Sequence, residues 1–153
     1  MKIVSGENPV HFKPHEIVCH AYRTHFDPVL HFAFVQGSIG DGRDVPARLH
    51  RADILNDIFS GGSIERCLNR FKEEGRGVLV YLRDGAAGVP LNVAGAESTE
   101  DTRQTLWREV GLGAQILRDL GVTSIRLRSD SPRKYVGLAG FGVEIAKVEP
   151  IEG

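Results

Sequence analysis

The sequence is poor in several features that mark specialised classes of protein. Cysteine occurs only at Cys19 and Cys67, too few for a secreted disulfide framework or for a zinc site with three or four cysteines. No apolar run approaches the roughly 18 residues of a membrane span, and the N-terminus lacks the apolar core of a signal peptide. Nineteen Lys and Arg face twenty Asp and Glu, a balance that argues against neutralisation of nucleic-acid phosphates. We therefore expect a soluble cytoplasmic protein that binds neither membranes nor nucleic acid.

What is present is the composition of an ordinary globular domain. The chain is 41% hydrophobic and 25% charged. A domain of this length buries roughly two-thirds of its unfolded surface, so it needs no metal or disulfide to fold. We expect a single domain over 1–153, in which 1–14 form an extended N-terminal arm.

The first third of the chain is rich in β-branched, aromatic and histidine residues, which are typical of strands. Strands are predicted over 15–24, 29–37 and 46–52, with turn residues between them. Because these strands follow one another closely, we expect an antiparallel meander or a partial barrel. The turn around Gly40 and Gly42 is interpreted as a hairpin rather than as a phosphate cradle.

The second half alternates between helix and strand patterns. Ile64, Cys67, Leu68 and Phe71 have the spacing of one helix face, which predicts a helix over 63–74. The further elements expected are a strand over 77–83, a long loop over 84–102, a helix over 103–120, a strand over 124–129, a short helix over 132–138 and a strand over 143–150. The predicted fold class is α/β (α+β), with N-terminal antiparallel strands followed by a mixed or parallel sheet with helices.

Several segments resemble one known family in the same order along the chain. The run GLGAQILRDLGVTSIRLRSDSPRKYVGLAGFGVEI (111–145) is similar to the end of a GTP cyclohydrolase II domain, the riboflavin-pathway enzyme that opens the guanine ring of GTP. AYR, HFAFVQG, ARLH and EEGRGVLVYLR resemble earlier family segments, so the resemblance covers nearly the whole chain from about residue 15. It implies the family's fold and a homodimer.

The resemblance fails where the family holds its zinc ion. Enzymes of this family use three cysteines, one just after an Arg-x-His motif and a Cys-x-Cys pair about ten residues later, and zinc activates the attacking water. Here Asp53 stands at the first position, and the segment of the pair is shortened to SGGSIERC, in which Cys67 lies on the apolar helix face. We expect no metal site and no cofactor, with Asp53 as a substitute ligand only a minor alternative.

The loop after YLR departs from the family as well. Gly85 stands where the family has a Glu and Ala87 where it has an Arg, both of which help to bind GTP. The family's following stretch, with a catalytic Tyr, has no clear counterpart here. Together with the missing cysteines, these changes imply a degenerate active site, a pseudoenzyme without GTP cyclohydrolase II activity.

Five residues of the family's phosphate chemistry have matches here. Arg108 aligns with the catalytic Arg, and Arg48 with an Arg that contacts the triphosphate. Ser129, Arg133 and Lys134 match the C-terminal nucleotide loop. Arg and Lys near helix N-termini suit phosphate. The simpler alternatives are that Arg108 is a solvated helix residue and that the loop is an N-cap followed by proline.

Other unusual residues have structural interpretations. The six histidines do not have the spacing of a metal site, and His50, which matches a family His, is assigned a structural hydrogen-bonding role. Cys19 is predicted to be a small core residue. Trp107 is expected on the exposed side of its helix, where it forms an interface or folds onto its own domain.

Two functional hypotheses follow. In the first, the domain binds a nucleotide or phosphorylated metabolite, regulates a partner or dimerises, like the C-terminal domain of some 3,4-dihydroxy-2-butanone 4-phosphate synthase fusion proteins. The chain would then be free-standing or part of a fusion. In the second, it is an enzyme of altered specificity that acts on a phosphorylated nucleotide or sugar through Arg108, with Asp84 or Asp53 as acid or base.

Overall fold

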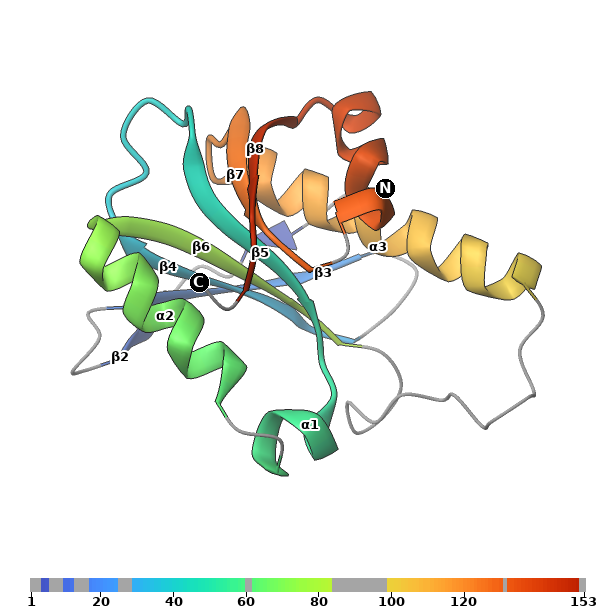
Figure 1. Ribbon diagram of the computed structural model, residues 1–153, viewed down its shortest axis with the longest axis horizontal. Helices are drawn as coiled ribbons and strands as arrows, with labels where there is room; N and C mark the ends of the chain where they lie inside the picture. The colour runs from blue at the N-terminus through green and yellow to red at the C-terminus, as the bar shows by residue number, and fades with distance from the viewer. Residues whose placement is uncertain are drawn as a thin grey trace.

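The computed structural model describes residues 4–5, 10–12, 17–24, 29–59, 62–83, 99–130 and 132–151. Its strands are β1 (Val4–Ser5), β2 (Val10–Phe12), β3 (Ile17–Arg23), β4 (His31–Gly37), β5 (Val45–Arg51), β6 (Arg76–Leu82), β7 (Ser124–Arg128) and β8 (Glu144–Glu149). Its helices are α1 (Ile54–Phe59), α2 (Ser63–Glu74), α3 (Thr99–Asp119) and the 3₁₀ helix η1 (Pro132–Phe141) (Figure 1).

The described strands form one mixed sheet of eight strands. Their order is β1-β3-β4-β6-β5-β7-β8, and β2 pairs with β3. The N-terminal strands are antiparallel as far as the β4–β6 pair, whereas β6, β5, β7 and β8 run parallel to one another. This arrangement confirms the predicted fold class.

The position of β5 corrects the predicted meander. β5 does not pair with β4, because β6 lies between them and pairs with both, so the predicted hairpin around Gly40 and Gly42 is wrong. The Gly42 carbonyl instead accepts hydrogen bonds from the backbone N–H groups of Thr123 (2.8 Å) and Ser124 (3.2 Å), where β7 begins. A Cβ on Gly42 would lie 1.9 Å from the Gly121 oxygen. Gly42 thus allows the connection between β4 and β5 to pack against the turn that precedes β7.

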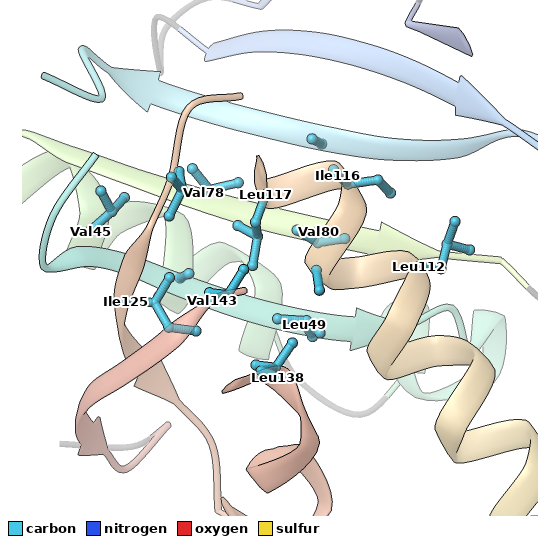
Figure 2. Packing of buried hydrophobic residues seen from close by; sticks show 14 of the residues in the cluster. Val45, Leu49, Val78, Val80, Leu112, Ile116, Leu117, Ile125, Leu138 and Val143 are labelled. Carbon is cyan, nitrogen blue, oxygen red and sulfur yellow. The ribbon is translucent and has the colours of Figure 1, made fainter. Parts of the chain in front are cut away.

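Helices cover both faces of the sheet. The helices α3 and η1 lie on one face and α2 on the other (Figure 1). The larger core lies beneath α3 and η1, and its labelled side chains point toward one another from β5, β6, β7, α3 and η1 (Figure 2). A Cβ on Gly113 of α3 would lie 2.5 Å from the Leu49 side chain, so the helix approaches β5 closely.

A smaller core joins α2 to the other face. Its buried members are Cys67, Phe71 and Leu79, and Phe34, Ile64 and Leu68 pack against them. The helix bounds and the apolar face predicted for α2 are confirmed. A Cβ on Gly77 would lie 2.1 Å from the Phe71 ring, so the ring packs directly on the backbone of β6.

Several boundaries differ from the sequence predictions. α3 begins at Thr99 rather than at 103, so the end of the predicted loop is helical, and 84–98 lie outside the described residues. The short helix α1 has no counterpart in the predictions, and Leu55, Ile58 and Phe59 on it are exposed rather than part of a buried stripe. Cys19 is only half-buried rather than a core residue. Parts of the predicted arm over 1–14 pair with β3, and its other residues lie outside the described ones.

Truncation of Phe71 tests the smaller core. Phe71 is fully buried, so Phe71→Ala should lower the free energy of unfolding by about 3–5 kcal/mol, measured by urea denaturation. The matched control is Phe59→Ala, because Phe59 is 78% exposed and its truncation should change stability by less than about 0.5 kcal/mol. Equal effects of the two substitutions would contradict this description of the core.

Candidate functional site

A topological switch point lies between the carboxyl ends of β5 and β7. These strands are parallel neighbours, but the chain leaves β5 toward α1 and α2 and leaves β7 toward η1, on the opposite face (Figure 1). Open α/β sheets bind ligands in the crevice that such a divergence creates. A hollow of about 200 Å³ lies there, which we call the switch-point hollow. Its lining residues are Arg48, Leu49, His50, Arg51, Arg128, Ser129, Asp130, Lys134, Tyr135 and Ile151.

The switch-point hollow is rich in cationic side chains. Arg48 on β5 and Arg128 on β7 are only 7% and 4% exposed. The register that places Ala47 opposite Leu127 makes these two arginines neighbours at the next position along the strands. A buried charge is costly unless another group compensates it, so the partners of each arginine decide what the hollow can bind.

The cations of the hollow are compensated to different degrees. Arg128 lies 3.4 Å from Glu149 and donates to the carbonyls of Pro150 and Ile151, each at 3.2 Å. Arg51 forms an ion pair with Glu109 at 3.2 Å. Within the described part of the chain, no carboxylate forms an ion pair with Arg48 or Lys134. The positive charges of these two residues are therefore not paired with any carboxylate that the structure describes, and such groups attract anions.

Neutral acceptors hold the guanidinium of Arg48. One terminal nitrogen donates to the Ser63 carbonyl at 3.1 Å, where α2 begins. The other lies 3.0 Å from His50 Nδ1 and 3.4 Å from the Ser63 hydroxyl. Arg48 is therefore fixed in direction while its charge is not cancelled.

His50 belongs to a cluster centred on Asp57 of α1. The two carboxylate oxygens of Asp57 lie 2.8 Å from His50 Nε2 and 2.9 Å from the Tyr81 hydroxyl. The backbone N–H of Asp53 also donates to Asp57, at 3.2 Å. The His50 and Tyr81 rings stack with their centroids 5.4 Å apart. The pKa of His50 is lowered mainly by burial and further by the charge of Arg48. The Asp57 carboxylate acts in the opposite direction.

The residues at the family's zinc position do not fit a zinc ion. The Asp53 carboxylate accepts hydrogen bonds from the backbone and side-chain nitrogens of Asn56, so it caps α1. The Cys67 thiol is buried in the smaller core, where burial raises its pKa and disfavours the thiolate that zinc requires. Among the described residues, no group of three His, Cys, Asp or Glu is placed to hold a metal.

The structure brings together some of the predicted site residues. Arg48, Ser129 and Lys134 all line the switch-point hollow. Arg133 and Arg108 are exposed and do not line it. Asp84, His15 and His25 lie outside the described residues. Trp107 is 60% exposed, and its ring lies edge-on to Phe141 at 5.6 Å.

The sequence analysis missed Arg51, Arg128, Asp57 and Tyr81. A usable signal existed for Arg128, which is the last residue of a strand in the half of the chain predicted to form a mixed or parallel sheet, where carboxyl ends of parallel strands meet at one edge. The strand that ends at Arg51 is predicted as part of the antiparallel meander, so the sequence did not indicate its place at that edge. The positions of Asp57 and Tyr81 depend on the fold of α1 against β6, which no local pattern indicates.

The fold and the order of its motifs define a domain of the GTP cyclohydrolase II type. A sequence model described as GTP cyclohydrolase II matches residues 4–150. The chain belongs to this family.

Its relatives are riboflavin biosynthesis proteins. The monofunctional chloroplastic protein RIBA 2 of Arabidopsis thaliana is 38% identical over 145 residues, which cover 86% of this chain and 30% of the relative. The protein RibBA of Chlorobium phaeovibrioides is 35% identical over 151 residues, covering 86% of this chain and 37% of the relative. The chain thus spans about a third of the length of these relatives.

A solved structure supports the fold. RibBX, a two-domain 3,4-dihydroxy-2-butanone 4-phosphate synthase from A. baumannii, superposes with a TM-score of 0.64 at 22% identity. The match covers 97% of this chain and 40% of that one. No helix among the described residues has the length and apolar character needed to cross a membrane.

The tyrosines provide a test of the buried hydrogen bonds. Burial and the hydrogen bond to Asp57 raise the pKa of Tyr81 to about 12, and burial raises the pKa values of Tyr22 and Tyr135. At pH 10, where a free tyrosine is half ionised, phenolate absorbance at 295 nm should be clearly lower in the folded protein than in the unfolded chain.

Stability should follow the same titration. A raised pKa in the folded state stabilises the protein fully below the unfolded pKa near 10 and loses this effect as the pH rises toward the folded pKa. The free energy of unfolding should therefore fall from about pH 10 toward pH 12. Half-ionised tyrosines at pH 10 in the folded protein would contradict the geometry around Tyr81.

Proposed function

We propose that this is a riboflavin-pathway domain that has lost zinc-dependent opening of the GTP ring and binds a nucleotide or phosphorylated metabolite in a regulatory or dimerisation role. One observation carries the proposal. The donors at the family's zinc position are used in helix capping and core packing, while Arg48 and Lys134 leave uncompensated positive charge in the switch-point hollow.

The loss of ring opening rests on the chemistry of the zinc position. The ring-opening reaction needs a water activated by a metal, and a zinc site needs ligands at fixed spacing. Asp53 is tied to Asn56 and the Cys67 thiol is enclosed in the smaller core. Neither side chain can turn toward a shared ion without breaking the contacts that fold its own helix.

Phosphate is the chemical group that the hollow suits best. A volume of about 200 Å³ is smaller than the roughly 300–1,000 Å³ of sites that enclose a drug-sized ligand. The phosphate end of a ligand would therefore enter the hollow, and the base or sugar would lie outside. Lys134 is exposed at the hollow's rim, where a point charge can follow a phosphate oxygen.

The relatives suggest a partner. RibBX is titled a two-domain 3,4-dihydroxy-2-butanone 4-phosphate synthase, and this chain covers 40% of it. We propose that the domain is fused to, or associates with, such a synthase, and that a homodimer forms through it. A cytoplasmic location stays a prediction, because plant relatives are named chloroplastic.

The alternative of an enzyme acting through Arg108 has less support. Arg108 is exposed on α3, outside the lining of the hollow. A residue that acts on a phosphate held by Arg48 and Lys134 would have to lie at that hollow.

Turnover of GTP tests the loss of activity. The purified protein with added Zn²⁺ and Mg²⁺ should release no pyrophosphate and form no ring-opened diaminopyrimidine, followed by chromatography. Formation of that product would mean that other residues rebuild the zinc site, and it would overturn this part of the proposal.

Thermal stabilisation tests phosphate binding. Inorganic pyrophosphate at 100 times its Kd should stabilise the folded protein by about 2.7 kcal/mol, which raises the Tm by roughly 5–10 °C. Lys134→Gln should reduce the shift at a fixed pyrophosphate concentration, because it removes an exposed cation of the hollow. Arg108→Gln is the matched control and should leave the shift unchanged. An equal loss in both variants would favour Arg108 as a phosphate-directed residue.

A further inference from the structure

We infer that Asp57 is a positioning residue of the switch-point hollow, which acts through His50 to fix the guanidinium of Arg48. The inference rests on the proposed function in that Arg48 is taken as an anion-binding group. Asp57 does not line the hollow itself, so its effect must be transmitted by the imidazole between them.

The geometry admits only one tautomer of His50. Arginine donates hydrogen bonds and accepts none, so Nδ1, 3.0 Å from the Arg48 nitrogen, must be unprotonated and accept. In the neutral ring the proton then lies on Nε2, which donates to Asp57 at 2.8 Å. The two contacts together define a relay in which the carboxylate fixes the imidazole and the imidazole fixes the guanidinium.

Asp57 is itself held in place. Besides His50, its oxygens accept from the Tyr81 hydroxyl at 2.9 Å and from the Asp53 N–H at 3.2 Å. The side chains of His50 and Asp57 are each only 11% exposed. Hydrogen bonds shielded from water in this way are stronger and more directional than those on the surface.

Loss of the carboxylate has a defined consequence for Arg48. Without an acceptor at Nε2, the ring is free to place its proton on Nδ1, where a donor would face the guanidinium of Arg48. The contact with His50 would then be repulsive. Ser63 would remain as the partner of Arg48, holding it only toward α2.

Nitrogen NMR of the histidine and arginine side chains tests the relay without any ligand. In the native protein, His50 should give the signature of a protonated Nε2 and an unprotonated Nδ1, and the terminal nitrogens of Arg48 should give separate, slowly exchanging signals. His50→Gln assigns the imidazole signals by their loss. In Asp57→Ala, the two tautomers should mix and the Arg48 signals should average.

Two variants separate positioning from simple loss of structure. Asp57→Glu retains a carboxylate, whose oxygens can accept from Nε2 and from the other donors, so it should restore the native tautomer. Tyr81→Phe removes a different hydrogen bond of Asp57 and leaves the relay intact, so both signatures should persist. An unchanged tautomer in Asp57→Ala, or its loss equally in Tyr81→Phe, overturns the inference.

Titration with inorganic pyrophosphate connects the relay to binding. Asp57→Ala should weaken binding by about tenfold, the size expected when a hydrogen bond that orients a charged group is lost, whereas Tyr81→Phe and Asp57→Glu should stay within about threefold of the native Kd. Native-like binding by Asp57→Ala, when its His50 tautomer has changed, would overturn the link to Arg48. If the native protein does not bind pyrophosphate, the proposed function fails, and the NMR signatures alone decide the relay.

Discussion

Strand β5 forms parallel hydrogen-bonded ladders with β6 on one side and with β7 on the other. As an interior strand, β5 has the larger core on one face and α1 and α2 on the other, so the alternation of its side chains decides which residues meet which layer. Val45, Ala47 and Leu49 enter the larger core, while Arg48 and His50 lie on the opposite face with α1 and α2. The same placement makes the chain diverge beyond β5 and β7, so the hollow exists because β5 is central.

Burying the adjacent arginines Arg48 and Arg128 costs desolvation free energy, and the structure compensates each of them in a different way. Arg128 is neutralised by Glu149 and held by the carbonyls at the end of β8. Arg48 contacts neutral groups, among them a carbonyl, a hydroxyl and an imidazole, which hold its guanidinium without cancelling its charge. An anion in the hollow would add the missing counter-charge. This contrast is the reason for proposing Arg48, rather than Arg128, as the arginine that binds an anion.

The local pattern of apolar residues in the sequence was enough to predict some helices and strands but not the order of the strands in the sheet. The helix over 63–74 could be predicted to the residue because its apolar spacing and the glycine that follows it are local signals. The pairing of β5 could not, since a parallel strand is placed by crossovers of many residues and its neighbours are distant in sequence. Arg48, Ser129 and Lys134 were found through a family resemblance, whereas Asp57 and Tyr81 meet only after α1 packs beside β6.

The contacts around Asp57 also bear on the proposal that a phosphate site remains here without the family's metal chemistry. A zinc ion both orders the loop that binds it and activates water. In this chain the ordering is supplied by hydrogen bonds, because one carboxylate gathers donors from His50, Tyr81 and the backbone of Asp53. These hydrogen bonds reach Arg48 through His50, but a carboxylate is not a Lewis acid and does not activate water as a metal ion does. Orientation and activation are therefore separable, and the proposed function, binding without turnover, requires only the first.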